Sequence, residues 1–167
     1  VLRKEPSPLA VINLNIGGEF LVGGELEKDE ILMLFKERLL NTEVALICTN
    51  CGWKSTTRVS RLKNRLEHLQ CPKCSSLMVT VAHPIDAELF VSALKKLNRK
   101  EGLEKEEESA YRRLIKASDL LKVYGFDAVL ALASYGVGPD TAARLLSQYK
   151  GEALLVALLE AERRYIR

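Results

Sequence analysis

Hydrophobic residues recur every three to four positions through much of the chain, and short β-branched runs interrupt this helical pattern. Residues 27–40 carry one apolar face and acidic residues in the first turn, which predicts an amphipathic helix that stops near Asn41. The apolar positions of that face are Ile31, Leu32, Phe35 and Leu39. Ahead of this helix, residues 11–22 predict a β-hairpin that turns at a Gly-Gly pair.

Three short strands are predicted in the middle of the chain. Residues 44–47 (VALI) would form the first, the β-branched stretch 56–59 would return from it, and residues 77–81 (LMVTV) would form the third. So small a sheet buries little apolar area, and we therefore expect a bound metal to stabilise it. Pro84 would end this region of the chain.

The remainder of the chain, residues 84–167, is predicted to be helical. We expect one helix from about 87 to 100 with Asp86 as its N-cap, because a short acidic side chain suits that position. A second helix would run from about 104 to 124, separated from the first by Gly102.

Beyond residue 126 the helical pattern breaks only at 136–139 and at Gly151. The charged residues between 95 and 113 are most simply interpreted as a solvated face. Within that stretch, the acidic run 104–108 would form the first turn of a helix, where the helix dipole favours negative charge.

The expected fold is α+β with three parts. Residues 1–42 would form a small N-terminal α/β segment, and residues 43–83 would form a four-cysteine zinc ribbon. Residues 84–167 would form an all-helical domain, with a helix-hairpin-helix-like motif around 126–149. The chain begins with Val1 rather than Met, so we expect it to be part of a longer protein.

Composition is that of a soluble globular protein: 47% of the 167 residues are hydrophobic and 28% are charged. No apolar run approaches the roughly 20 residues that a membrane helix needs. Residues 1–10 are charged and interrupted by proline, unlike a secretory signal. We therefore expect a cytoplasmic location and no membrane partner.

All four cysteines fall into two C-x2-C pairs, Cys48 with Cys51 and Cys71 with Cys74. Each pair can place two thiolates on one tight turn, and two such turns complete a tetrahedron around Zn²⁺. Four protein ligands leave no open position on the metal, so the predicted zinc site is structural rather than catalytic.

Three alternatives to the zinc site remain open at this point. The cysteines could form two structural disulfides, although nothing indicates secretion. One pair could be a redox C-x-x-C motif, although no βαβ unit accompanies it. His68, three residues before Cys71, could also replace one cysteine as a ligand, although solvation in a basic loop is the simpler interpretation.

Positive charge is concentrated between the first and the last cysteine. The whole chain carries 25 basic and 22 acidic residues. The resulting net charge of +3 is too close to neutral to indicate or exclude nucleic-acid binding. The segment from Cys48 to Cys74 contains six basic residues and a single acid, Glu67, and four thiolates on zinc would still leave it at roughly +3. Such a local excess is typical of a surface that faces phosphates. We expect the backbone of a nucleic acid to follow Lys54, Arg58, Arg61, Lys63 and Arg65.

Trp53 lies directly after the first cysteine pair and has two possible roles. It could stack on a base, a contact worth on the order of 1–3 kcal/mol. It could instead cover the small metal site, as an apolar side chain next to such a site commonly does.

A Gly-Val-Gly turn at residues 136–138 separates two short helical segments. Pro139 suits the first turn of the following helix, and the glycines permit positive φ and a close approach of the backbone. The unpaired N–H groups of the turn and helix start would form an anion site made of Gly136, Val137, Gly138 and Thr141, with Arg144 reaching a phosphate.

The alternative is an ordinary helical corner. Asp140 slightly favours it, because this residue places an acid where a phosphate would approach.

Signatures of catalysis are missing. The glycines at 18 and 23 have the spacing of a phosphate-binding loop, but Gly24-Glu25 stands where such a loop needs Lys-Ser/Thr. The only histidines are His68 and His83, so acid–base catalysis has few candidates. We therefore expect this chain by itself not to be an enzyme and to have no small-molecule substrate.

Three segments, in this order, resemble the C-terminal region of archaeal superfamily-two helicases of the Ski-like and Lhr-like group. They are Lys36-Glu-Arg-Leu-Leu-Asn-Thr42 leading into the four-cysteine ribbon with Cys51-Gly52-Trp53, then Tyr135-Gly-Val-Gly-Pro-Asp-Thr-Ala-Ala-Arg-Leu-Leu146, then Leu158-Leu-Glu-Ala-Glu-Arg-Arg-Tyr165. The resemblance runs from about residue 36 to the end. It implies that the parent protein is an ATP-dependent RNA or DNA helicase whose motor domains lie upstream, while residues 1–25 match nothing in the pattern.

The expected function of this chain is to bind single-stranded RNA or DNA through its phosphate backbone, without reading sequence. The alternative is a docking module whose zinc ribbon recruits a protein partner, because Arg and Trp also anchor protein interfaces. A third possibility, an enzyme acting through the metal, would need a vacant ligand position that four cysteines do not leave.

Overall fold

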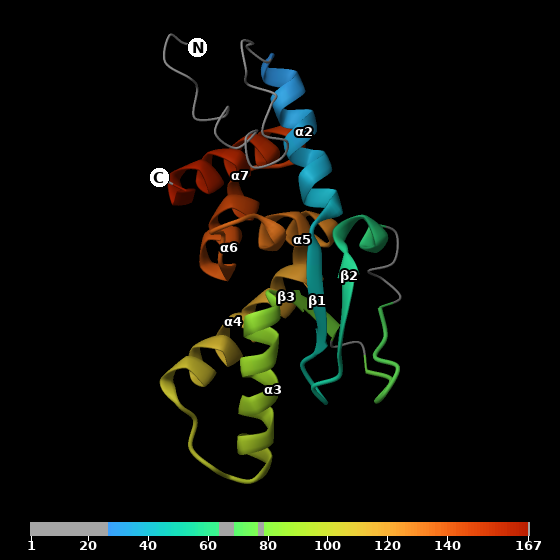
Figure 1. The fold of residues 1–167 in the computed structure, drawn as a ribbon, viewed down its shortest axis with the longest axis vertical. Helices are drawn as coiled ribbons and strands as arrows, with labels where there is room; N and C mark the ends of the chain where they lie inside the picture. Colours follow the sequence, from blue (N-terminus) through green and yellow to red (C-terminus); the bar gives the residue numbers. More distant parts are fainter. Residues whose placement is uncertain (1–26, 64–68, 77–78, 167) are drawn as a thin grey trace.

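The computed structural model describes residues 27–63, 69–76 and 79–166, and they form a mixed α/β fold that is mostly helical (Figure 1). The strands are β1 (Glu43–Cys48), β2 (Lys54–Arg58) and β3 (Val79–Ala82). The α-helices are α2 (Lys28–Asn41), α3 (Pro84–Asn98), α4 (Lys105–Tyr124), α5 (Phe126–Ala133), α6 (Pro139–Gln148) and α7 (Gly151–Ile166), and a 3-10 turn, η1, spans Val59–Leu62.

The strands form one antiparallel sheet in the order β2-β1-β3. β1 is the central strand, with Val44 opposite Thr57 of β2 and Leu46 opposite Val81 of β3. β2 pairs on one side only, so it is an edge strand of the described sheet. Five of the six residues of β1 are buried, which is expected of a strand covered on both faces.

Alternate side chains of β1 enter two different hydrophobic clusters, as the period of two in a strand requires. Val44, Leu46 and Cys48 belong to a large cluster that also contains residues of α2, α5, α6 and α7. Ala45 and Ile47 belong to a smaller cluster with residues of α3 and α4. The central strand of the ribbon therefore contributes to both parts of the core.

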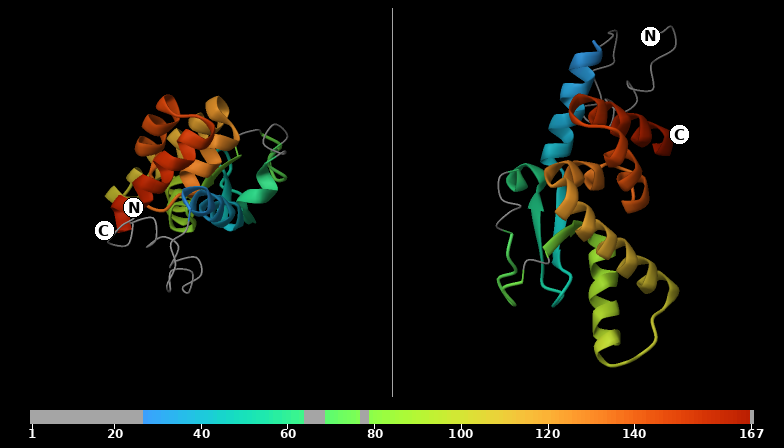
Figure 2. Two further views of the ribbon diagram at one scale, coloured as in Figure 1. Left: turned by 90° about the horizontal axis from the view of Figure 1, so that it is seen from above. Right: turned by 180° about the vertical axis from the view of Figure 1, so that it is seen from behind.

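The described chain is elongated, with α2 and α7 at one end and the pair α3–α4 projecting at the other (Figures 1 and 2). Phe90 of α3 stacks on Tyr111 of α4, with ring centroids 5.3 Å apart, which fixes the two helices against each other. None of the helices in the described part of the chain is long and apolar enough to cross a membrane.

The predicted helix at 27–40 is confirmed, and its face of Ile31, Leu32, Phe35 and Leu39 is buried. The first two ribbon strands are also confirmed, although the second ends at Arg58 because Val59 enters the turn η1. The third strand covers Val79–Ala82; residues 77–78 lie outside the described residues, as does the hairpin predicted at 11–22.

The prediction of Asp86 as an N-cap is wrong. α3 begins at Pro84 with His83 as its N-cap, because proline fits the first position of a helix and moves the start forward. Asp86 lies in the first turn instead, where it accepts two hydrogen bonds from Arg113 of α4 at 2.8 and 3.1 Å.

The interpretation of the charges at 95–113 as a solvated face is also wrong in part. Glu107 is buried and accepts hydrogen bonds from Ser92 and from Lys96, the latter at 2.8 Å. It also accepts the backbone N–H of Glu104 at 2.9 Å, completing a capping box at the start of α4. The three hydrogen bonds hold the pKa of Glu107 at about 2, with the Lys96 bond as the largest cause.

Candidate metal centre and adjoining surfaces

The first cysteine pair lies in a tight turn that closes the β1–β2 hairpin. The backbone N–H of Cys48 donates to the carbonyl of Trp53 at 2.8 Å, and that of Gly52 donates to the carbonyl of Cys48 at 2.9 Å. Gly52 has a φ of 82°, a region that glycine adopts without steric cost. This turn brings the sulfurs of Cys48 and Cys51 to the same side of the backbone.

The second pair repeats the same backbone pattern 23 positions later. The N–H of Cys71 donates to the carbonyl of Ser76 at 2.9 Å, and that of Ser75 donates to the carbonyl of Cys71 at 2.8 Å. Ser75 occupies the position of Gly52 and has a φ of 63°. The two turns are therefore equivalent, except that the second has a serine at the position of positive φ.

The four sulfurs lie close together. Sγ of Cys48 is 3.6 Å from Sγ of Cys74, and Sγ of Cys51 is 3.6 Å from Sγ of Cys71. All four lie within 4.8 Å of one another. Zinc–sulfur bonds of about 2.3 Å at tetrahedral angles place sulfurs about 3.8 Å apart, so the residues fit a zinc site with four cysteine ligands. No two of the four cysteines form a disulfide in this structure, and the paired sulfurs lie 3.6 Å apart, so the geometry favours the metal site over two disulfides.

Hydrogen bonds to sulfur prepare this cluster for a cation. The backbone N–H groups of Lys73 and Cys74 both donate to Sγ of Cys71 at 3.4 Å. Hydrogen bonds with Ser76 and then with Asn50 lower the pKa of the Cys74 thiol to about 5. Polar groups that favour thiolates are the surroundings expected of metal-binding cysteines.

The pKa of the Cys51 thiol is shifted in the opposite direction. The backbone N–H of Trp53 favours its thiolate, but burial and the neighbouring sulfurs outweigh this effect and raise its pKa to about 12. A bound zinc ion would lower the pKa of Cys51 again, because its positive charge favours the deprotonated thiols that serve as its ligands. The alternative ligand His68 lies outside the described residues.

The basic side chains of the ribbon lie at its surface. Lys54 and Arg58, at the two ends of the edge strand β2, are exposed, as are Arg61 and Lys63 just beyond it. Residues 44–66 contain no Asp or Glu, and none of these four side chains forms an ion pair within the described residues. Arg65 lies outside the described residues.

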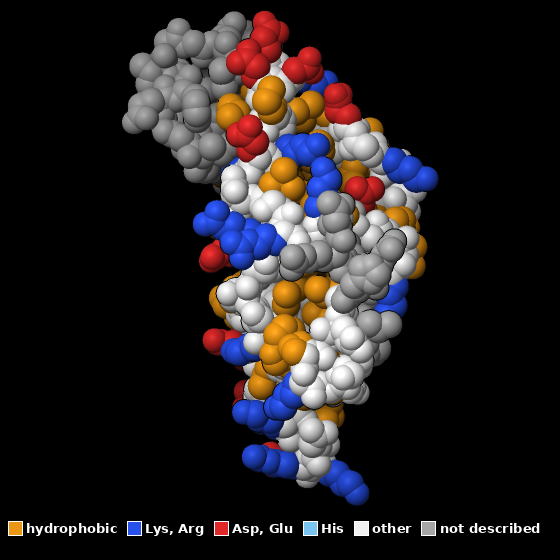
Figure 3. All heavy atoms as spheres, turned by 90° about the vertical axis from the view of Figure 1, so that its right-hand side faces the viewer, with side chains coloured by type: hydrophobic (Ala, Val, Ile, Leu, Met, Phe, Trp, Pro, Cys, Tyr) orange, Lys and Arg blue, Asp and Glu red, His pale blue; other side chains and the backbone are white. Residues whose placement is uncertain are grey.

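Figure 3 shows the side of the molecule that carries the ribbon. Lysine and arginine side chains are spread along its middle and lower parts, with apolar side chains between them, while most acidic side chains gather towards the end where α2 begins. The face therefore combines positive charge with exposed apolar area.

Trp53 is half-buried and packs against the hydrophobic cluster that contains Cys48 and Cys71. This placement favours the covering role over base stacking. The stacking role stays a prediction for the exposed part of the indole.

The region of the predicted helical hairpin contains two short helices, α5 and α6, joined by a tight turn. Gly136 has a φ of 76°, whereas Gly138 is in the ordinary extended region with a φ of −86°. Gly138 is the N-cap of α6 and Pro139 follows as its first residue, as expected. Val137 between the glycines is buried, so its side chain anchors the turn to the core.

The other residues predicted for phosphate binding differ in exposure. Arg144 is exposed on α6, while Thr141 is half-buried. Asp140 pairs with Lys116 of α4, so its charge is offset by a neighbouring cation. The helix-hairpin-helix assignment itself remains a hypothesis, because a turn between two helices also fits an ordinary corner.

Buried Glu162 of α7 holds this turn in place. The sequence analysis did not identify Glu162 as a residue of the site. Its side chain is fully buried and forms an ion pair with Arg38 of α2. The same oxygen, Oε2, accepts the backbone N–H of Tyr135 at 2.9 Å. One carboxylate therefore connects the helix before the ribbon with the hairpin turn.

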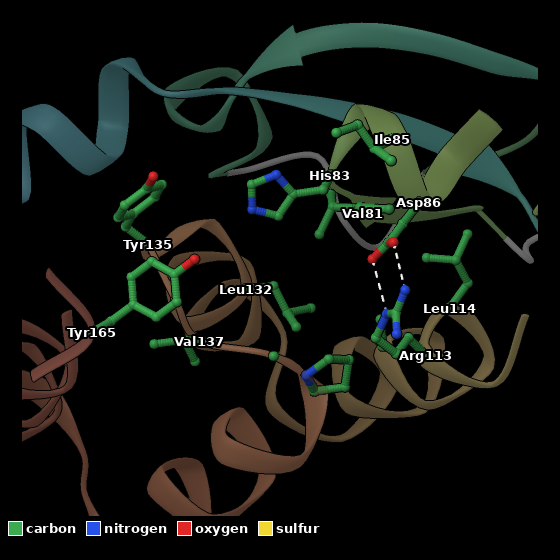
Figure 4. Close-up of a pocket in the computed structure, with 15 residues that line it drawn as sticks. Val81, His83, Ile85, Asp86, Arg113, Leu114, Leu132, Tyr135, Val137 and Tyr165 are labelled. Atoms are coloured by element: carbon green, nitrogen blue, oxygen red, sulfur yellow. Dashed lines mark hydrogen bonds and ion pairs between the residues drawn. The ribbon is translucent and has the colours of Figure 1, made fainter. Parts of the chain in front are cut away.

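A cavity of about 570 Å³ adjoins the hairpin turn (Figure 4). Tyr135 and Tyr165 lie together at one end of it, and the ion pair of Asp86 with Arg113 lies at the other. His83 points towards its centre. These residues come from β3–α3, α4, α5–α6 and α7, so no local sequence signal could have predicted the cavity.

Comparison of the chain with protein-family models, with curated proteins and with solved structures finds no match. What the chain does must therefore be argued from its own residues.

Proposed function

We propose that this chain binds single-stranded nucleic acid through its phosphate backbone, as an accessory region of an ATP-dependent helicase. The observation that carries the proposal is the acid-free edge of the ribbon. Lys54, Arg58, Arg61 and Lys63 are all exposed, and none of them forms an ion pair within the described residues. Glu43 of β1 lies opposite Arg58 in the sheet but forms no ion pair with it. Unpaired cations along one edge of a sheet attract a polyanion by releasing its counterions.

The cysteines would contribute by holding this edge in place. Cys48, Cys51, Cys71 and Cys74 would bind zinc, which supplies a fixed tetrahedral cross-link and no open ligand position. The first cysteine turn directly precedes β2, so the turn sets the direction of the strand that carries Lys54 and Arg58. The metal is therefore proposed to act through structure alone.

The hairpin would form a second contact with phosphate. The start of α6 presents backbone N–H groups, and Arg144 is exposed one turn further along the helix. Asp140 forms an ion pair with Lys116, which reduces the repulsion between its exposed carboxylate and an anion at this position. The contact would be independent of base sequence, since only backbone groups and one cation take part.

The test is fluorescence anisotropy of the zinc-loaded chain with single-stranded RNA, DNA of the same sequence, and a duplex, at several salt concentrations. We expect binding that weakens with a log–log slope of about −0.7 per phosphate contact on single strands. The single variant Arg61→Ala, which removes one exposed arginine of the ribbon, should reduce both the affinity and the slope. Arg112→Ala is the matched control, because it removes an exposed arginine on α4 outside the ribbon.

Equal losses in the ribbon variant and the control would show that only net charge matters. No binding to any of the three nucleic acids, with zinc retained, would overturn the proposal.

A docking role is the second candidate, and the single-sided pairing of β2 favours it. An edge strand offers N–H and C=O groups to which a partner can add a strand. Docking of this kind depends on main-chain pairing and apolar anchors such as Trp53, so it would respond far less to salt. Pull-down with the zinc-loaded chain as bait would identify such a partner.

A further inference from the structure

The cavity beside the hairpin turn has the size and the lining of a small-molecule-sized site. Its volume of about 570 Å³ falls within the range of roughly 300–1,000 Å³ typical of ligand pockets. It opens next to Gly136 and Gly138, the turn that we propose as a phosphate contact. A group attached to a bound phosphate would therefore lie within reach of the cavity.

One end of the cavity is aromatic. The rings of Tyr135 and Tyr165 meet edge-to-face, with centroids 5.1 Å apart and planes at 88°. Tyr135 is 50% exposed and Tyr165 is 60% exposed, which is high for a pair of large aromatic residues. In an edge-to-face pair, the ring that offers its edge keeps both of its faces clear of its partner. An aromatic surface is thus available for stacking.

The position of Tyr165 is built into the turn. A Cβ atom on Gly136 would lie 2.3 Å from Cγ of Tyr165, so the ring rests directly on the glycine backbone. Glu162, one helical turn earlier on α7, accepts the N–H of Tyr135 at 2.9 Å. Both tyrosines are therefore placed by contacts that involve the turn itself.

The rest of the cavity is suited to a flat heterocycle. Its floor includes the apolar side chains of Leu132 and Val137 (Figure 4). The far end holds Arg113 and Asp86, whose side chains are 41% and 22% exposed, so donors and acceptors reach the edge of a ligand. Because these two charges neutralise each other, this end suits a neutral polar ligand better than a phosphate.

We propose that this cavity binds one unstacked nucleobase of a single strand, stacked against the tyrosine pair with its polar edge towards Asp86 and Arg113. Single-stranded recognition combines these two features, aromatic stacking and hydrogen bonds to the base edge. The proposal rests on the proposed function, because the phosphate of the same nucleotide would lie at the hairpin turn. It adds a contact to a base, which the proposed binding of the phosphate backbone by the ribbon and the hairpin turn (the backbone grip) does not make.

The experiment compares two strands of equal charge, about 10 nucleotides long, in the same anisotropy assay. One strand carries bases and the other consists of abasic residues. The backbone grip predicts binding of both strands with the same salt slope. The base site predicts that the strand with bases binds about five-fold or more tightly.

Substitutions in the cavity test whether it causes this difference in affinity between the two strands. Tyr165→Ala should reduce the affinity for the strand with bases towards that of the abasic strand, so that the ratio of the two affinities falls towards one. Tyr165→Phe should keep the difference, because the ring remains. Tyr149→Ala is the matched control, since Tyr149 is also exposed but does not line the cavity.

A second readout does not depend on Tyr165→Ala folding normally. In the unmodified protein, a single 2-aminopurine in the strand should change its fluorescence on binding, and Tyr165→Phe should keep that change. Equal affinity for both strands would overturn the base site and leave the backbone grip standing. Failure of both strands to bind would overturn both proposals.

Discussion

Glu162 and Tyr135 are joined by a hydrogen bond of 2.9 Å from the backbone N–H of Tyr135 to the buried carboxylate. The same carboxylate pairs with Arg38, so a single charged group connects α2, α7 and the turn between α5 and α6. A buried charge is costly unless it is paired and hydrogen-bonded, and Oε2 of Glu162 meets both conditions. Oε1 of Glu162 and Nε of Arg38 are buried with no hydrogen-bond partner among the described residues. The geometry of the turn therefore depends on a residue far from it in the sequence.

The first prediction concerns this connection. Glu162→Gln should lower the free energy of unfolding by about 2 kcal/mol, because it leaves the partly buried Arg38 without a counter-charge. Chemical denaturation measures the loss. In a double-mutant cycle with Arg38→Met, the two changes should cost clearly less together than the sum of the single changes. Additive losses would show that the pair contributes nothing beyond its two separate side chains.

The second prediction compares the two glycines of the turn. Gly136→Ala should destabilise the protein by about 2 kcal/mol or more, because Gly136 has positive φ and an added Cβ would collide with Tyr165. Gly138→Ala should be almost neutral, since its φ is ordinary and nothing lies within 4 Å of the added atom. Thermal unfolding distinguishes the two, and similar melting temperatures would contradict the described turn.

The third prediction uses the equivalence of the two cysteine turns. Ser75→Gly should stabilise the chain by roughly 0.5–1 kcal/mol, because it removes a side chain from a position with a φ of 63°. The reverse experiment, Gly52→Ala, should destabilise it, since Gly52 has positive φ and its Cβ would lie 3.3 Å from Leu94. Zinc-loaded protein should be used for both, with denaturant midpoints as the readout.

The fourth prediction concerns removal of the metal. A strong chelator should disorder more than the ribbon, because Cys48 and Cys71 belong to the same hydrophobic cluster as residues of α2 and α7. Loss of ordered Trp53 fluorescence together with a lower melting temperature would be the expected result. Substitution with Co²⁺ should give the absorption bands of tetrahedral thiolate coordination, and Cys71→Ser should weaken them. A chain whose melting is indifferent to chelator would contradict a structural role.

The fifth prediction is a pH dependence from Glu107. Hydrogen bonds from Lys96, Ser92 and the Glu104 N–H hold its pKa at about 2, against an ordinary value of 4.5. A depressed pKa contributes stability that is fully present above pH 4.5 and is lost as the pH falls towards 2. The melting temperature of the wild type should therefore exceed that of Glu107→Gln at neutral pH.

This difference should shrink steadily below pH 4.5. Taking the difference between the two proteins cancels the loss of metal from the thiols, which acid would cause in both. A difference that is constant down to pH 2 would show that the Glu107 carboxylate is not held by these bonds.

Local patterns in the sequence predict much of this fold. The helix at 27–40, the first ribbon strands and the cysteine cluster all follow from residues a few positions apart. The spacing of Cys48 and Cys51 constrains both sulfurs to one turn, so the candidate metal site could be predicted from the sequence alone.

Features that depend on distant packing could not be predicted. The run 104–108 has the composition of a solvated face, and only the packing of α3 on α4 buries Glu107 within it. Glu162 likewise stands in a charged stretch at the end of α7. The tyrosine end of the cavity brings together residues 135 and 165, which no periodicity links.

The alternation of β1 has a consequence for protein engineering. Leu46 packs in one hydrophobic cluster and Ile47 packs in the other. The strand therefore belongs to both parts of the core and cannot be exchanged independently of them. A chimera that exchanged only residues 43–83 for a ribbon from another source would have to match both neighbouring surfaces at once. The smallest transplantable unit is therefore the ribbon together with α3 and α4 on one side and α2 and α5 on the other.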